Sequence, residues 1–337
     1  MVSTMSLFFE DVKRRKAFVS GLAGLTLLAL AIGMVIPLIF SRLSTAFPAI
    51  APFLGIEGDE LGFAAILIPA GMASITLFCL VLEAYFLGYK DSSARKIILN
   101  ETPSVRTDVF YTLLRISGFF MILAMIFSFG GLYVAVDYIK AEFAFAFLKY
   151  TDNILIQFVV FVFIFTFVNY WAHRLLHSKV LWEIHKVHHS AEDYNVLLPY
   201  RNHPVDFILG TLYGVAIATI LGARPETTVL WLATNAVYQS MVHSMYDWKG
   251  DWLEIIFITP SAHRIHHSTA PEHFNSNLGI LSIWDRMFGT YVPPTDEPIN
   301  FGVPEQENFN TDRYFTEIIA CFLRWLSLKR VKAGDVT

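Results

Sequence analysis

The chain has little charge for its length. Charged residues make up only 16% of its 337 residues, whereas a soluble domain averages about 25%. Hydrophobic residues account for 55%, and the mean hydropathy is +0.49. The formal net charge of −4 is also small, so we expect no nucleic acid or other polyanion as a partner. So few charges cannot cover a water-facing globule of this size, and the composition favours one membrane domain.

Cysteine is scarce as well. The two cysteines, Cys79 and Cys321, lie far apart in apolar stretches, so we expect buried thiols rather than a disulfide. A cleavable signal peptide is not expected, because the first apolar run is long enough to span a bilayer and no small-residue cleavage site closes it.

Long apolar runs are what the sequence has in place of charge. A helix that crosses a bilayer needs about 20 mostly apolar residues. Four stretches predict spans: Ala17–Phe40, Leu61–Gly88, Val109–Val136 and Ile154–Trp171. Two shorter runs, Val205–Leu221 and Thr228–Met245, flank the turn at residues 222–226 and predict a helical hairpin that either spans or re-enters the membrane. The predicted fold is all-α, a polytopic membrane helical bundle of about four spans plus this hairpin.

Basic residues predict the orientation of these helices, because loops rich in lysine and arginine stay in the cytoplasm. Four of them precede the first span, and four more lie in the loop after the second span: Lys13, Arg14, Arg15, Lys16, Lys90, Arg95, Lys96 and Arg106. The N-terminus is therefore predicted to be cytoplasmic. The fourth span then ends on the cytoplasmic side, where a helical cap would follow it. The C-terminal helix expected over Tyr314–Lys329 either lies on the inner membrane surface or packs on the core.

All 11 histidines fall within residues 173–273, under a third of the chain. Two form an i, i+4 pair, and six form two HxxHH clusters. Positions i, i+3 and i+4 share one face of a helix, so each cluster is predicted to aim its imidazoles at a common point. With His243, which follows Gln239 at the same i, i+4 spacing, these residues make nine candidate metal ligands, more than one ion can hold: His173, His177, His185, His188, His189, His243, His263, His266 and His267.

The spacing predicts a pair of metal ions but does not identify the element. Imidazole suits iron, zinc, copper and nickel. The sequence has no HExxH zinc-peptidase motif, no ExxH pairs typical of carboxylate-bridged di-iron bundles and no cysteine near the histidines. These absences leave iron as the first choice and zinc as the second. A metal-transporting or metal-sequestering membrane protein is the alternative, but its histidines should lie at several depths rather than at one face.

These motifs resemble the fatty acid hydroxylase / sterol desaturase superfamily of membrane di-iron oxygenases. The resemblance covers roughly residues 165–292 and is carried by HRLLH at 173–177, WEIHKVHHS at 182–190, NHP at 202–204, QSMVH at 239–243, TPSAHRIHHS at 259–268, NSNLG at 275–279 and WDRMFGT at 284–290. The SAEDYN segment at 190–195 and the QxxxH pattern are similar to the alkylglycerol monooxygenase branch. Ser178 stands where the family often has a glutamate, which weakens the case for ether-lipid cleavage.

The resemblance implies a catalytic domain over residues 153–292, between an N-terminal transmembrane region (1–152) and a C-terminal loop and amphipathic helix (293–337). It implies the nine histidines as ligands of two iron ions, O2 as co-substrate, a lipid drawn from the bilayer and oxidation of an inert C–H bond. Seven further residues are candidates for a ligand or for orienting one: His203, Gln239, His273, Asp193, Asn195, Asn277 and Asp285. The sequence contains no flavin or haem motif, so we expect an external ferredoxin, cytochrome or flavoprotein reductase as electron donor.

Overall fold

The computed structural model describes most of the chain from the second predicted span onward. The described residues are 60–99, 102–120, 138, 146–247, 252–303, 309 and 314–334. They form helices, with two isolated bridges between Phe257 and Leu281 and between Ser268 and Phe301. The all-α prediction is confirmed for this part of the chain. The first predicted span, Ala17–Phe40, lies outside it.

Two of the described helices are long and apolar enough to cross a membrane: α7 (Ile154–Leu176) and α9 (Pro204–Leu221). Helix α7 begins where the Asn153 side chain accepts hydrogen bonds from the backbone N–H groups of Leu155 and Ile156, which satisfies two of its free donors. The helix extends beyond the predicted end at Trp171. His173 therefore lies in its last turn and His177 caps it.

Helix α9 and helix α10 (Pro225–Val242) form the predicted hairpin. Gly222 ends α9 in the left-handed conformation, with φ at +66°, and Pro225 starts α10 at a position where no backbone donor is needed. Helix α10 ends at Val242, so His243 is the residue that caps it.

Among the described helices before α7, one matches a predicted helix and another corrects a prediction. Helix α2 (Glu60–Leu87) matches the second predicted span and leads through η2 (Tyr89–Asp91) into the short α3 (Ser93–Leu99). The span predicted over Val109–Val136, interrupted only by Arg115, is wrong at its start, and its part from residue 121 on lies outside the described residues. Helix α4 begins at Pro103 and ends at Ile116, because Gly118 adopts a φ of +75° that a right-handed helix cannot continue through.

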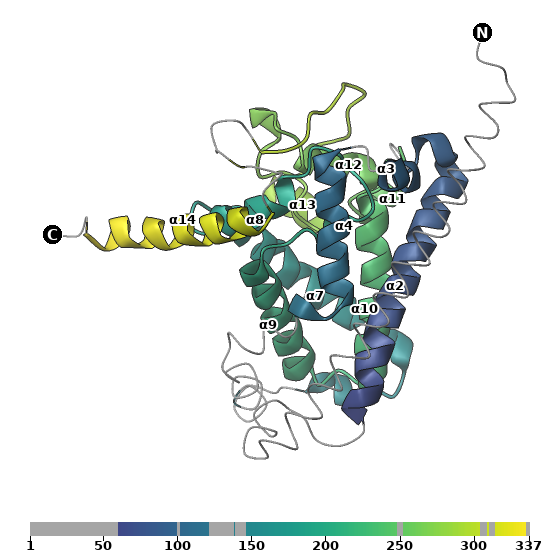
Figure 1. Ribbon diagram of the computed structural model, residues 1–337. Coiled ribbons are helices and arrows are strands. Elements are labelled where there is room, and N and C mark those ends of the chain that lie inside the picture. The colour runs from purple at the N-terminus through teal and green to yellow at the C-terminus, as the bar shows by residue number, and fades with distance from the viewer. Residues whose placement is uncertain are drawn as a thin grey trace, which may run out of the picture.

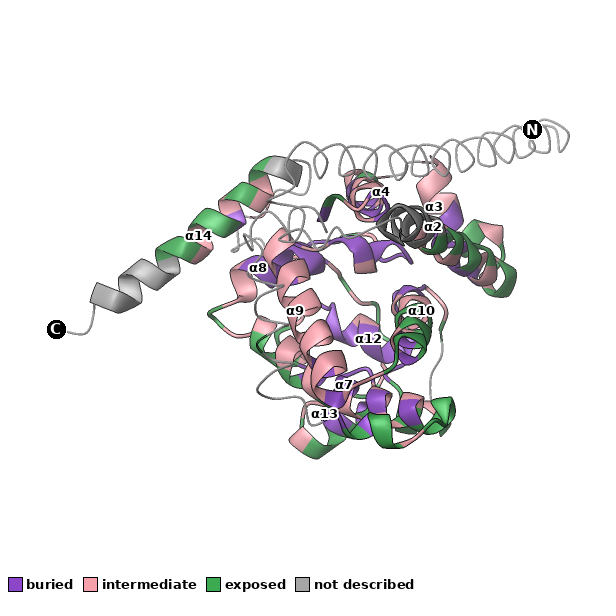
Figure 2. Cartoon of the chain, turned by 90° about the horizontal axis from the view of Figure 1, so that it is seen from below, coloured by how far each residue is buried: buried purple, intermediate pink, exposed green. Residues whose placement is uncertain are grey.

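Short helices gather toward one end of the long ones (Figure 1). They are α3, α8 (Trp182–His189), α11 (Trp252–Ile256), α12 (Pro260–His266) and α13 (Ser282–Phe288). Figure 2 shows that α8 and α12 are largely buried, whereas α2, α7 and α9 present many exposed or half-buried residues. The histidine-bearing segments are therefore enclosed by the rest of the fold.

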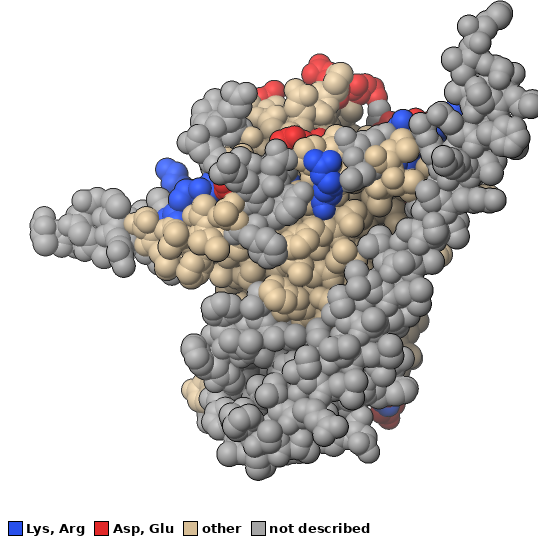
Figure 3. Space-filling model, viewed as in Figure 1, with Lys and Arg blue, Asp and Glu red and all other residues tan. Residues whose placement is uncertain are grey.

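The outer surface of α7 is apolar. Leu155, Val159 and Phe163 are 67%, 58% and 51% exposed, while Phe165 faces inward and packs on Trp231 of α10 with ring centroids 4.7 Å apart. In the face seen in Figure 3, the described charged residues lie mainly toward the end where the short helices gather. An apolar belt below a charged end is the surface expected of a protein that sits in a bilayer.

Helix α14 (Tyr314–Gly334) projects sideways from the bundle near α8 (Figure 1). Cys321 is fully buried against Tyr111 and Val187, and Arg324 donates to Glu183 of α8 at 2.9 Å. Ile319 and Leu323 are more than half exposed. One face of this helix thus packs on the protein, and its other face leaves apolar side chains uncovered. Both Cys79 and Cys321 are free and buried, as the sequence predicts.

Candidate metal centre

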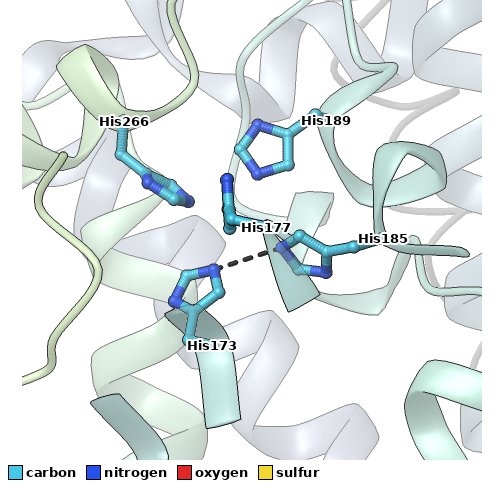
Figure 4. Close-up of side chains that lie close together, drawn as sticks. All are labelled: His173, His177, His185, His189 and His266. Carbon is cyan, nitrogen blue, oxygen red and sulfur yellow. Dashed lines mark hydrogen bonds between the residues drawn. The ribbon is translucent and has the colours of Figure 1, made fainter. Parts of the chain in front are cut away.

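The nine predicted histidines lie together in two adjoining groups. In each group the ligand atoms lie within 4.8 Å of one another. The five-histidine group contains His173, His177, His185, His189 and His266. The four-histidine group contains His188, His243, His263 and His267. Figure 4 shows the rings of the five-histidine group turned toward a shared centre.

Each HxxHH cluster is divided between the two groups, so the prediction that a cluster aims all its imidazoles at one point is wrong. Helix α8 gives His185 and His189 to the five-histidine group and His188 to the four-histidine group. Helix α12 and its cap give His263 and His267 to the four-histidine group and only His266 to the five-histidine group. Residues i and i+4 are offset by about 40° around a helix, and i+3 lies on the other side of i, so two neighbouring centres can share one cluster.

Backbone carbonyl groups fix the protonation of four rings. The Nδ1 atoms of these rings lie 2.7–3.3 Å from carbonyl oxygens: His173 from Leu278, His188 from Arg201, His243 from Gln239 and His266 from Ser276. A carbonyl oxygen only accepts, so each Nδ1 must carry the proton and donate. The Nε2 atom of each neutral ring is then left with an unshared electron pair, the form that binds a metal ion.

His185 is held in the same way by a carboxylate. Its Nδ1 donates to Oδ2 of Asp206 at 2.8 Å, with both side chains nearly buried. Asp206 stands in the first turn of α9 and was not among the residues singled out from the sequence. Nothing in the sequence marked Asp206 as a partner of a histidine. Acidic residues are common in the first turn of a helix because they interact favourably with the helix dipole.

The Nε2 atoms of His173 and His185 lie 3.1 Å apart (Figure 4, dashed line). Both rings carry a proton at Nδ1, so in the neutral form of either ring Nε2 has an unshared electron pair and cannot donate. Two unshared electron pairs at this distance repel each other unless a cation lies between them. Two imidazoles bound at right angles to one ion, each at the usual metal–nitrogen distance of about 2.1 Å, would place their nitrogens about 3 Å apart.

Further ring nitrogens are buried without a hydrogen-bond partner among the described residues: Nε2 of His177, His189 and His266, and Nδ1 of His263. An unpartnered buried polar atom is costly, and here three of the four atoms belong to the five-histidine group. The donor set is entirely imidazole and leaves buried ring nitrogens without a partner, so these residues fit bound transition-metal ions.

Electrostatics keep the rings neutral. Burial lowers the pKa of His188, His189, His263 and His267 well below the usual value, and the neighbouring imidazoles lower it further. A protonated imidazole cannot bind a metal ion through the protonated nitrogen. The fold therefore favours the protonation state that metal binding needs.

Asp285 supports the centre indirectly. Its carboxylate accepts hydrogen bonds from the backbone N–H groups of Leu278 and Gly279 at 2.7 and 2.8 Å, and the Leu278 carbonyl in turn holds His173. A Cβ at Gly279 would lie 2.7 Å from this carboxylate, so only glycine permits the close approach. Burial raises the pKa of Asp285, and its hydrogen bonds oppose that shift.

The other candidate residues do not join either group. His203 caps α9, accepting from Val205 N–H at Nδ1 and donating from Nε2 to the Ile318 carbonyl. His273 contacts Ser268, and Asn277 bonds to the backbone of Ala262 and Val292. Gln239 meets His243 through its backbone carbonyl.

Asp193 and Asn195 bond to residues outside the two histidine groups. Asp193 accepts from Thr102 and lies 3.8 Å from Lys96. Asn195 donates to Asp108 at 2.7 Å. Both residues tie the α8–α9 connection to the region of α3 and α4.

The fold and the site define a class of protein: an α-helical protein with bilayer-length apolar helices and a buried nine-histidine centre at one end of them. Residues 158–290 match the family model for fatty acid hydroxylase. This part of the chain is similar to that family, and the resemblance seen in the histidine motifs is confirmed.

The named proteins that this chain resembles are lipid monooxygenases and hydroxylases. Alkylglycerol monooxygenase of Xenopus tropicalis is 34% identical over 161 residues, which are 47% of this chain and 35% of that protein. Ornithine lipid hydroxylase OlsE of Rhizobium tropici is 35% identical over 44% of this chain and 45% of its own length. Sphinganine C4-monooxygenase 1 of Arabidopsis thaliana is 29% identical over 41% of this chain and 54% of its own length. The similarity to the alkylglycerol monooxygenase branch is thereby confirmed.

These matches span between about a third and just over half of the relatives' own lengths. No solved structure matches the chain.

Proposed function

We propose that the chain is a membrane-bound di-iron oxidoreductase that hydroxylates, desaturates or mono-oxygenates a lipid with O2. The observation that carries this proposal is the 3.1 Å approach of the Nε2 atoms of His173 and His185 inside a buried cage of imidazoles. The names of the relatives, all monooxygenases or hydroxylases, favour oxygen insertion over metal transport. The placement of both histidine groups side by side, rather than along a path through the bundle, favours it too.

The five-histidine group would hold one iron ion and the four-histidine group the other. Zinc fits the same donors but does not change its oxidation state, so a redox reaction requires iron or another redox-active metal. When bound, the metal pair supplies the reduction of O2: one oxygen atom enters the lipid C–H bond and the other leaves as water, with two electrons and two protons delivered from outside.

The chain's own residues prepare the centre for this chemistry. Asp206 and the four backbone carbonyls keep a proton on Nδ1 of five rings, which directs each Nε2 toward the metal. Partners of this kind set ring orientation and ligand basicity. Burial of the cage excludes bulk water from the reacting atoms.

The apolar belt supports a substrate drawn from the bilayer. We propose a multi-pass protein with its N-terminus and its metal centre on the cytoplasmic side, where an external ferredoxin, cytochrome or flavoprotein reductase can deliver electrons. The basic residues before the first predicted span and between α2 and α4 support this orientation. We further propose the three-part organisation 1–152, 153–292 and 293–337.

The proposal is tested by expressing the chain and comparing lipid extracts by mass spectrometry with those from cells that carry His188→Ala. We expect a lipid that gains one oxygen atom or loses two hydrogens only with the intact chain, and isotopic oxygen from O2 in any hydroxylated product. Purified protein should contain about two iron ions per chain. Bound metal without any O2-dependent lipid product would favour the metal-sequestering alternative.

A further inference from the structure

A fully buried ion pair joins α4 to the segment between α8 and α9. The guanidinium Nε of Arg201 donates to Oδ1 of Asp108 at 2.7 Å, and neither side chain is exposed. Arg201 also donates to the carbonyl and hydroxyl of Ser104 at 2.6 and 3.0 Å and to the hydroxyl of Ser190 at 3.1 Å. Three of these hydrogen bonds tie the Arg201 side chain to α4, and the fourth ties it to Ser190, the residue that caps α8.

The carbonyl group of this same residue holds a ring of the four-histidine group. The oxygen of Arg201 accepts from Nδ1 of His188 at 3.3 Å. The Arg201 side chain touches no histidine, so it acts on His188 by fixing the place of the carbonyl. Asp108 and Ser104 belong to α4, which lies outside the segment that matches the fatty acid hydroxylase family.

A second buried carboxylate, Glu83 of α2, also supports the four-histidine group. The buried carboxylate of Glu83 accepts from the backbone N–H of Met245 at 3.0 Å, two residues after His243. It also accepts from the backbone N–H and the hydroxyl of Ser93 at 2.6 and 2.9 Å. Both carboxylates that support the four-histidine group, Asp108 and Glu83, therefore lie within residues 60–120.

The five-histidine group is supported differently. Its identified Nδ1 partners are Asp206 and the carbonyls of Leu278 and Ser276. All three lie within residues 158–290. The Nδ1 partners of the four-histidine group, the carbonyls of Arg201 and Gln239, lie in the same segment. The two groups differ in that the four-histidine group has additional support from Asp108 and Ser104 of α4 and from Glu83 of α2.

We propose that Asp108 and Arg201 are positioning residues that set metal affinity at the four-histidine group, so that helix α4 controls the occupancy of one metal position and not the other. This inference rests on the proposed binding of two metal ions. Because a charged group left alone in a buried site is strongly disfavoured, loss of Asp108 would displace the Arg201 backbone and with it the acceptor of His188.

The experiment measures metal content and metal release in the full chain, purified in detergent with both positions loaded. Metal per chain is determined by mass spectrometry, and release to a chelator is followed in time. For Asp108→Asn and Arg201→Lys we expect one ion to be retained as in the unaltered chain and the other to bind about 10- to 100-fold more weakly. The milder Ser104→Ala removes the hydroxyl that accepts from Arg201 and from the backbone N–H groups of Glu192 and Asp193 but keeps the ion pair, and it provides a variant for release kinetics if the stronger changes prevent folding.

Reference variants identify the ion that is lost. His263→Ala removes a ligand of the four-histidine group and His266→Ala one of the five-histidine group. The Mössbauer spectrum of iron remaining in Asp108→Asn should match that of His263→Ala. Thr227→Val is the matched control, since it removes a buried side-chain hydrogen bond to Gln157 between α7 and α10, and it should retain both ions.

The outcomes separate the two proposals. An unaltered chain that binds no metal defeats the proposed function. An unaltered chain with two ions, combined with Asp108→Asn and Ser104→Ala that keep both ions with unchanged release, overturns the positioning role. Loss of both ions together from a folded Asp108→Asn, or a spectrum that matches His266→Ala, overturns the selectivity for one group.

Discussion

The rings of His189 and His267 stack with their centroids 4.4 Å apart and their planes at 25°. His189 belongs to the five-histidine group and His267 to the four-histidine group, so this is one of the ring contacts that join the two groups. The first residue comes from α8 and the second caps α12. The proposed centre is therefore assembled by two short helices placed face to face, each of which supplies both groups.

Two histidines three residues apart should affect different metal ions. We expect His263→Ala to weaken the ion of the four-histidine group and His266→Ala that of the five-histidine group, each leaving the other ion tightly bound. The physical reason is that α12 points these side chains into separate groups. Metal per chain after dialysis against a chelator measures the effect, and His273→Ala, which belongs to neither group, should keep two ions. Loss of the same spectroscopic component from both variants would contradict the division.

Removing the charge of Asp206 should weaken the five-histidine group. In Asp206→Asn the acceptor of His185 loses its charge, so we expect about 10- to 100-fold lower metal affinity with the fold retained. Competition with a chelator of known affinity measures the loss. The matched control is Asp193→Asn, an aspartate that contacts Thr102 and Lys96 instead, and it should bind metal normally. Equal effects of the two changes would assign Asp206 a general structural role.

Acid should destabilise the metal-free protein. Burial lowers the pKa of His188, His189, His263 and His267 below the ordinary 6.5, so at intermediate pH the unfolded chain binds more protons than the folded chain. The free energy of unfolding then rises with pH, and stability is lost as the pH falls below about 6.5. The midpoint of thermal unfolding, measured in detergent between about pH 8 and about pH 5, should decrease. A midpoint that stays constant over this range would show that these rings do not resist protonation.

Gly222, which ends α9 in the left-handed conformation, should not tolerate a side chain. A Cβ at Gly222 would lie 2.8 Å from Cα and 2.9 Å from Cβ of Ala146, at a φ of +66°. We expect Gly222→Ala to lower the free energy of unfolding by at least about 1–2 kcal/mol from the left-handed backbone alone, with the clash in addition. Thermal inactivation in detergent measures it. Gly210→Ala, inside α9 with its nearest atom at 3.9 Å, is the control and should be neutral or slightly stabilising.

Much of the helical framework follows from local sequence. The apolar runs predicted α2, α7 and the hairpin of α9 and α10, since a continuous apolar stretch favours a helix that satisfies its own backbone in lipid. The interruption at Gly118 was missed, because a glycine inside an apolar run is compatible with either a helix or a turn. His203 looked like a candidate ligand for its chemistry, yet its place before Pro204 made it the cap of α9.

The sequence by itself singled out the nine histidines, because i, i+3 and i+4 spacing is a property of a single helix. Only the tertiary structure decided how they are shared between two groups, since that depends on how α8 and α12 face each other. It also decided the partners that orient the rings. Asp206 reaches His185 across 21 positions, and Asp108 reaches Arg201 across 93. No local pattern encodes such contacts, because they arise only when distant helices pack and their buried polar groups must find partners.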